Sequence, residues 1–149
     1  MVPNAGMTGE TVMPALRNYR VFISHSWTYK DQYDRLVELL KEEPYFEWSN
    51  HSVPKDDPIH NASNAAQLRE AIKKQMQGVN CVVILAGVYS TYSKWIKEEI
   101  NLAKDLEKPI VAVEYWGSER TSQVVKDNAD KIVGWNAASV VKAIRDLSI

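Results

Sequence analysis

Short runs of β-branched and aromatic residues alternate with amphipathic helical stretches along most of this chain, and this alternation constrains the fold more than any other feature. The run at 79–87 (VNCVVILAG) is apolar except for Asn80, as expected for a central parallel strand that is buried on both faces. Further short runs at 19–24, 45–48, 109–116 and 131–135 predict four more strands. Because each strand is followed by a helical pattern or a turn into one, the chain predicts a parallel sheet covered by helices on both sides.

The helical stretches carry apolar residues at the spacing of a single helix face. The last of them, for example, places Val140, Val141 and Ile144 on one side. At 149 residues the chain suits one domain. We therefore predict an α/β flavodoxin-like three-layer sandwich with a five-stranded parallel sheet, in the order 2-1-3-4-5 when strands are numbered along the chain. The domain is expected to cover 18–149, after a flexible N-terminal arm at 1–17 that has no periodicity.

Charge and hydropathy exclude several classes of protein. Lysine and arginine number 18 and aspartate and glutamate 19, which gives a net charge of -1. This balance excludes a strongly basic nucleic-acid binder and a polybasic membrane-binding patch. No run approaches the roughly 18 apolar residues needed to span a bilayer, and the first residues show no secretory leader. We expect a cytoplasmic protein that binds neither nucleic acid nor membranes.

The sequence offers no pattern of metal ligands. Its one cysteine, Cys81, lies in the apolar run CVVIL and is predicted to be a buried thiol. The polar stretch 49–63 holds two histidines and two aspartates, namely His51, Asp56, Asp57 and His60. Their spacing matches no known ligand pattern and two prolines interrupt it, so a polar loop is favoured over a metal site.

One helix has a carboxylate on its apolar face. At about 100° per residue, Glu99 falls between Leu106 and Ala103, whereas Glu98 falls on the polar arc. An ionised carboxylate that is buried alone is too costly, so Glu99 must have a partner, be protonated or line a cavity. Trp95 stands four residues earlier on the same face. A structural carboxylate paired with an arginine or a helix N-terminus and a functional acid beside an indole both fit this pattern.

The first predicted strand ends in SHSW, residues 24–27. In a doubly wound sheet this position is the carboxyl edge, where hydroxyls and free backbone N–H groups hold phosphate or ribose oxygens. An N-cap for the helix that starts near Lys30 is the simpler alternative. The glycine-rich motifs of dinucleotide binding and nucleotide hydrolysis are absent from the sequence, and so is the G-x-S-x-G elbow of serine hydrolases.

Taken in order, several motifs resemble one known family. They are RVFISHSW at the first strand, SVPKDDP in the long polar stretch, SKWIKEE before PIVAV, and IVGWNAASVVKAI near the end. Together they resemble the Toll/interleukin-1 receptor (TIR) domain, and more closely the prokaryotic TIR-like branch that includes the Thoeris antiphage signalling proteins. The resemblance runs from about Tyr19 to Leu147.

The resemblance implies an activity and a site. In enzymatic TIR domains a glutamate on the helix after the third strand, commonly four residues after a tryptophan, is essential for cleaving the nicotinamide–ribose bond of NAD. This pattern maps onto Trp95 and Glu99, and the resemblance implies that Glu99 is catalytic. The substrate-binding residues implied are Ser24, His25, Ser26, Trp27, Asn50, Asp57 and Trp95. NAD is then a substrate, and neither a cofactor nor a metal is expected.

The resemblance also implies partners and a product. Transfer of the ribosyl group to water gives ADP-ribose, and other acceptors give a cyclic or a conjugated product. Self-association is expected, as is an effector protein that responds to the product in antiphage defence. The main alternative is a non-enzymatic TIR-like interaction module, in which Glu99 is structural. A phosphoacceptor receiver domain lacks its acidic cluster and its strand-end aspartate here, and the near-neutral charge disfavours a nuclease-like relative.

Overall fold

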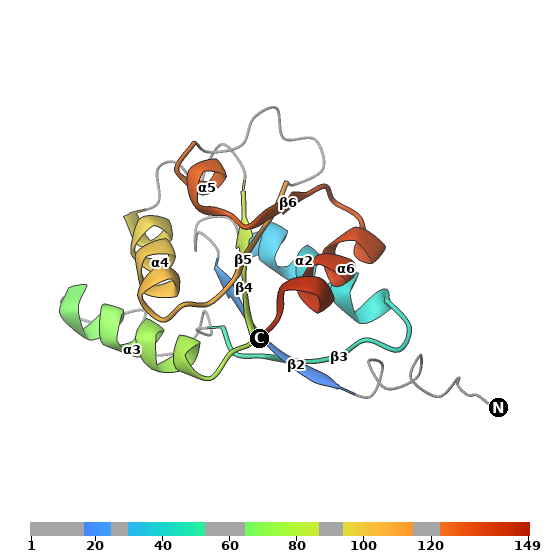
Figure 1. Cartoon of the computed structure of the whole chain (residues 1–149), viewed down its shortest axis with the longest axis horizontal. Helices are drawn as coiled ribbons and strands as arrows, with labels where there is room; N and C mark the ends of the chain where they lie inside the picture. Colours follow the sequence, from blue (N-terminus) through green and yellow to red (C-terminus); the bar gives the residue numbers. More distant parts are fainter. Residues whose placement is uncertain (1–16, 25–29, 53–64, 87–93, 115–122) are drawn as a thin grey trace.

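The computed structural model describes residues 17–24, 30–52, 65–86, 94–114 and 123–149, and its strands form one parallel sheet (Figure 1). The strands are β2 (Asn18–Ser24), β3 (Glu47–Asn50), β4 (Cys81–Leu85), β5 (Ile110–Val113) and β6 (Lys131–Val133). Their order across the sheet is β3-β2-β4-β5-β6, and every neighbouring pair is parallel. The flavodoxin-like order predicted from the sequence is therefore confirmed.

Helices cover both faces of this sheet (Figure 1). They are α2 (Lys30–Glu42), α3 (Ala65–Gln77), α4 (Lys94–Asp105), α5 (Gln123–Asn128) and α6 (Ala137–Leu147). The helices α2 and α6 pack on one face, and α3, α4 and α5 pack on the other. The result is the three-layer sandwich predicted from the sequence.

Each face of the sheet has its own hydrophobic core. Leu36, Leu40 and Ile144 pack against Ile23 on the α2/α6 face, while the other core includes Phe22 of β2 and the side chains that α3 and α4 bury against it. Consecutive residues of β2 alternate between these cores, as the period of a strand requires. Ser24, one residue after Ile23, therefore faces the layer that contains α4.

The second strand begins later than predicted. The sequence predicts a strand over 45–48, but Tyr45 has φ 62°, in the left-handed region that an extended strand cannot use. The Tyr45 side chain is 81% exposed, and only from Phe46 does the chain turn inward, where the ring stacks on Tyr19 with 5.5 Å between centroids. The strand β3 consequently runs on to Asn50, into the stretch predicted to be loop.

The helix α4 ends in a tight reversal. Glu107 has φ 56°, the N–H of Lys108 donates to the carbonyl of Ala103 at 2.8 Å, and the N–H of Glu107 donates to that of Lys104 at 3.1 Å. This pair of bonds is the Schellman arrangement, which satisfies the last carbonyls of a helix. It directs the chain into β5 without a long connection.

The predicted N-terminal arm at 1–17 lies outside the described residues except for Arg17 and stays a prediction. Among the helices that the structure describes, none has the length and apolar character needed to cross a membrane.

Candidate active site

The order of the strands creates a switch point between β2 and β4. From β2 the chain crosses to β3 on one side, and from β4 it continues to β5 on the other. In open parallel sheets ligands bind beyond the carboxyl ends of the strands at such a point. Ser24 is the last residue of β2 and pairs with Ile84 of β4, which places it at this edge.

Ser24 and Glu99 form a buried pair at the switch point. The Ser24 side chain is fully buried and Glu99 is 6% exposed. The Ser24 hydroxyl donates to Oε1 of Glu99 at 2.5 Å. The prediction that Glu99 lies on the apolar face of its helix is confirmed, because Ile96, Ile100 and Ala103 of α4 are buried beside it in the same layer.

Burial raises the pKa of Glu99 to about 8, although the hydrogen bond from Ser24 lowers it. A carboxyl group removed from water loses the hydration that stabilises its charged form, and one neutral donor does not restore it. Among the described residues no lysine, arginine or histidine makes an ion pair with Glu99. The group is therefore poised to change its charge near neutral pH.

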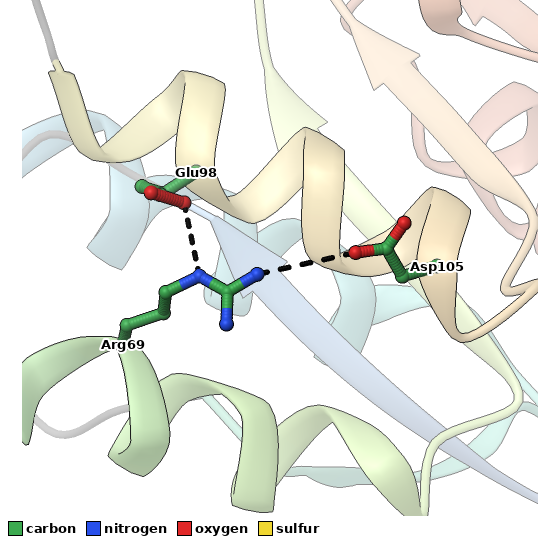
Figure 2. Close-up of polar contacts among 3 residues, drawn as sticks. All are labelled: Arg69, Glu98 and Asp105. Carbon is green, nitrogen blue, oxygen red and sulfur yellow. Dashed lines mark hydrogen bonds and ion pairs between the residues drawn. The ribbon is translucent and has the colours of Figure 1, made fainter. Parts of the chain in front are cut away.

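The neighbouring carboxylate, that of Glu98, forms an ion pair with Arg69. Nε of Arg69, on α3, lies 3.3 Å from Oε2 of Glu98, and its Nη2 lies 3.9 Å from Oδ2 of Asp105 (Figure 2). Figure 2 shows the guanidinium between these two side chains of α4, which stand two turns apart. Glu98 is thus a partly exposed residue that links α3 and α4, as its place on the polar arc predicts, and Arg69 pairs with Glu98 and not with Glu99.

Asn50 is described by the structure, and its contacts lead to the other face of the sheet. Its Nδ2 donates to the hydroxyl of Tyr33 on α2 at 2.8 Å, and its Oδ1 accepts from the backbone N–H and the hydroxyl of Ser52 at 3.0 and 2.5 Å. The Ser52 hydroxyl in turn accepts from the backbone N–H of Ile23 at 2.9 Å. The structure therefore brings Asn50 to the end of β2 through Ser52, without a hydrogen bond to Ser24 or Glu99.

Ser52 and Tyr33 are the two members of this arrangement that the sequence did not indicate. Tyr33 lies in the helical stretch after the first strand, and Ser52 lies in the polar stretch 49–63, and neither position carries a pattern that marks a site. A buried serine two residues after an asparagine is a pattern for an Asx-type turn, and this was the only local indication available. The contact to Ile23 depends on how β3 pairs with β2.

Several predicted site residues lie outside the described part of the chain. They are His25, Ser26, Trp27 and Asp57. Trp95 belongs to α4, but its side chain is not among those described. Their roles in substrate binding stay predictions. The long stretch at 49–63 is described only as far as Ser52.

Within the described residues, no group of three or more histidine, cysteine, aspartate or glutamate side chains is placed to hold a metal ion. Cys81 is buried in β4, as predicted, and its burial, together with the charge of Asp130, raises the pKa of the thiol to about 12. A thiol that stays protonated is a poor nucleophile. The chemistry that the described residues can offer at the switch point is therefore that of a carboxyl and a hydroxyl.

The chain has five tryptophans, and two of them are explained by packing. Trp48 and Trp135 are partly buried against the core on the α2/α6 face. Trp48 lies within β3, where it pairs with Tyr19 of β2, and Trp135 follows the end of β6. These two residues contribute to the core rather than to the switch point.

A three-layer domain with a parallel sheet in this strand order belongs to the class of doubly wound α/β domains. Its sequence matches the family model described as "Thoeris protein ThsB, TIR-like domain" over residues 22–120. The chain belongs to this family of TIR-like domains. No curated protein matches it.

Two solved structures are among those similar to this one. The CMP N-glycosidase BcmB of Clostridium botulinum has 15% identity and a TM-score of 0.53, and the match covers 84% of this chain and 97% of that one. A 3-dehydroquinate dehydratase-like protein of Bifidobacterium longum has 14% identity and a TM-score of 0.43, with 89% and 95% covered. The first likeness shows that both chains share a fold.

Proposed function

We propose that this protein cleaves the N-glycosidic bond between nicotinamide and ribose of NAD, with Glu99 as the catalytic carboxyl group. The observation that carries the proposal is the Ser24–Glu99 pair, buried at the switch point with one hydroxyl donor to the acid. NAD is the substrate, and the reaction needs no cofactor or metal.

The chemistry of the bond explains why a carboxylate is useful there. Cleavage of an N-glycosidic bond develops positive charge on the ribose ring, as glycoside hydrolysis does. A fixed negative charge in a site that excludes water stabilises such a transition state far more than one in bulk water. Nicotinamide leaves as a neutral base, so Glu99 does not have to act as a general acid.

The raised pKa fits this use. In the free protein Glu99 has a pKa of about 8 and is mostly protonated at pH 7. A positively charged group beside a carboxyl lowers its pKa, and the nicotinamide ring of NAD carries such a charge. Substrate therefore favours the ionised form that the transition state needs.

Ser24 has a supporting part in this mechanism. Its hydroxyl donates to Oε1, which fixes the orientation of the carboxylate and leaves Oε2 for the ribose. A preorganised acid loses less free energy to reorientation during the reaction than a mobile one. The residues that follow in the chain, His25 to Trp27, are proposed to contact the substrate, with Trp95 and Asp57.

The comparisons support a glycosidase in two ways. The family to which the chain belongs contains a Thoeris protein, and the resemblance seen in the sequence links such domains to NAD. The N-glycosidase from Clostridium botulinum uses the same fold on a nucleotide. Both substrates contain a base joined to ribose, so the shared chemistry is cleavage of that bond.

The fate of the ribosyl group defines the biological output. Water as acceptor yields ADP-ribose, an internal nucleophile yields a cyclic product, and a second molecule yields a conjugate. We propose that this product is a signal for an effector protein in antiphage defence and that self-association of the domain accompanies activity. Mass spectrometry of the reaction mixture distinguishes the three products.

The test compares two adjacent glutamates. Nicotinamide release from NAD is measured for the wild type, Glu99→Gln and Glu98→Gln, and cytosine release from CMP is measured in parallel. We expect Glu99→Gln to lower NAD turnover by about 100-fold or more, because it removes the charge and keeps the shape, while Glu98→Gln retains most activity. Equal turnover by wild type and Glu99→Gln contradicts the assignment, and cytosine release without nicotinamide release assigns a different substrate.

The interaction module is the second function that the family allows. In such a module a buried carboxylate serves the fold, and removal of its charge should leave binding intact. The absence of a cationic partner for Glu99 among the described residues argues against this role, since structural carboxylates in cores are paired. A wild-type protein that turns over neither NAD nor CMP, at any concentration at which it self-associates, favours the module.

A further inference from the structure

Just after β3 ends, the buried hydroxyl of Ser52 completes the hydrogen bonding between β2 and β3. The N–H of His51 donates to the carbonyl of Val21 at 2.8 Å, which continues the parallel pairing one residue past β3. In a regular ladder the N–H of Ile23 would next bond to a backbone carbonyl of β3. Instead it donates to the hydroxyl of Ser52 at 2.9 Å, a contact that is buried.

Asn50 fixes the direction of that hydroxyl. The Ser52 hydroxyl has one proton, and it donates this proton to Oδ1 of Asn50 at 2.5 Å. Its lone pairs are then free to accept from Ile23. Asn50 is held in turn, because its Nδ2 donates to the hydroxyl of Tyr33 on α2 at 2.8 Å. A continuous line of hydrogen bonds therefore joins α2, β3 and the end of β2.

This series of hydrogen bonds ends at Ile23, one residue before Ser24, which donates to Glu99. Ile23 points into the core on the α2/α6 face, and Ser24 points to α4, where its hydroxyl meets Glu99 at 2.5 Å. Ser24 follows Ile23 directly, so the hydrogen bond of the Ile23 N–H adds to the pairing with β4 in holding the end of β2. This hydrogen bond of 2.5 Å is lost when its two atoms move about 1 Å further apart, so the placement of the strand end affects whether the pair forms.

We propose that Ser52, oriented by Asn50, is a positioning residue that holds the end of β2 so that Ser24 can donate to Glu99. The proposal rests on the proposed glycosidase function for its consequence in catalysis. Asn50 then acts through Ser52, from the face of the sheet opposite α4, rather than by contact with the substrate.

The test compares two serines of the same strand pair. Ser52→Ala removes the acceptor for Ile23, whereas Ser49→Ala removes only the hydrogen bond that Nδ2 of Asn18 donates to the Ser49 hydroxyl, 2.8 Å away at the start of β2. We expect kcat for nicotinamide release to fall about tenfold in Ser52→Ala with little change in KM, since misplacement of a reacting group affects the chemical step. Ser52→Thr keeps the hydroxyl and should restore kcat, and Ser49→Ala should match the wild type.

A second variant and a second measurement guard against a failure to fold. Asn50→Ala keeps the Ser52 hydroxyl but frees it, and the exposed position should tolerate the change, with a smaller fall in kcat. In the free protein, the NMR signals of the Glu99 carboxyl carbon and the Ser24 amide should move in Ser52→Ala and Asn50→Ala, and not in Ser49→Ala.

The outcomes separate the two proposals. If the wild type cleaves no substrate, the proposed function fails, and the NMR shifts still decide whether Ser52 positions the pair. If the wild type is active and folded Ser52→Ala has the same kcat and the same Glu99 signal, Ser52 has no positioning role. A loss of kcat that Ser52→Thr does not restore contradicts the hydrogen bond as its cause.

Discussion

Glu98 and Glu99 are consecutive residues of α4 that occupy opposite environments. Glu98 is partly exposed and pairs with Arg69, whereas Glu99 is buried and receives a hydrogen bond from Ser24. The pKa of Glu99 is raised to about 8 by burial. Two chemically identical side chains on one helix therefore have separate roles, and each is a control for the other.

The raised pKa of Glu99 predicts how stability changes with pH. The unfolded chain releases this proton near pH 4.5 and the folded chain keeps it to about pH 8, so the folded state binds more protons in this window and loses stability as pH rises. Glu99→Gln has no such loss, so its free energy of unfolding should gain on the wild type by up to about 1.4 kcal/mol per pH unit within the window. Urea unfolding at pH 4.5 and pH 8 measures the change. A difference between the two proteins that is the same at both pH values shows that Glu99 titrates normally.

The same pKa predicts the pH dependence of catalysis. In the proposed mechanism the ionised form of Glu99 is the active one, so kcat/KM for NAD should rise with pH and level off above about pH 8. Ser24→Ala removes the hydrogen bond that lowers the pKa, and the rise should move to higher pH as well as to a lower plateau. A pH profile that is flat between pH 6 and pH 9, or a Ser24→Ala profile with an unmoved rise, would contradict the role of the pair.

The Arg69 bridge should contribute little to stability. Its side chain is 38% exposed and that of Glu98 is 37% exposed, so solvent and salt screen the pair. Arg69→Met should lower the free energy of unfolding by about 0.5 kcal/mol or less at high salt and somewhat more at low salt. Thermal unfolding at two salt concentrations measures this. Nicotinamide release should persist in Arg69→Met, and its complete loss would show that α4 depends on this bridge.

Cys81 should report the opening of the sheet. Its thiol is buried in β4 and has a pKa of about 12, so a thiol reagent should not react with the folded protein at pH 8. Reaction should begin only when β4 separates from its neighbours, and its rate should rise with urea in parallel with unfolding. Cys81→Ala should keep NAD turnover. Rapid labelling of the native protein would show that β4 is accessible without unfolding.

Much of the fold could be predicted from local patterns, because the residues of each helix or strand themselves show the periodicity of that element. The apolar run around Cys81 gave the central strand, and the spacing of Val140, Val141 and Ile144 gave the last helix. The predicted start of β3 was wrong because Tyr45 adopts a left-handed backbone conformation. The tyrosine side chain does not favour this conformation, and only the turn after α2 imposes it. At this position the connection between α2 and β3 overrides the backbone preference of the tyrosine.

The candidate site was predictable where a local pattern marked a residue, as the apolar face of α4 did for Glu99 and the end of the first strand did for Ser24. Glu99 was found because a carboxylate on an apolar helix face conflicts with the periodicity around it. Ser52 gave no such conflict, since a serine in a polar stretch is ordinary, and its contact with Ile23 exists only through the register of β3 on β2. The periodicity of a single helix gives no information on how strands that are distant in the sequence pair with each other.

The separation of Ser24 and Glu99 along the chain has a consequence for folding. The two residues stand 75 positions apart and meet only when β2 has paired with β4 and α4 has docked on the sheet. Closing a loop of that length costs conformational entropy before any of its contacts form, so partly folded chains hold no such pair. Under the proposed function, a nascent or misfolded copy is therefore inactive, and the protein can act on NAD only after β2, β4 and α4 have come together.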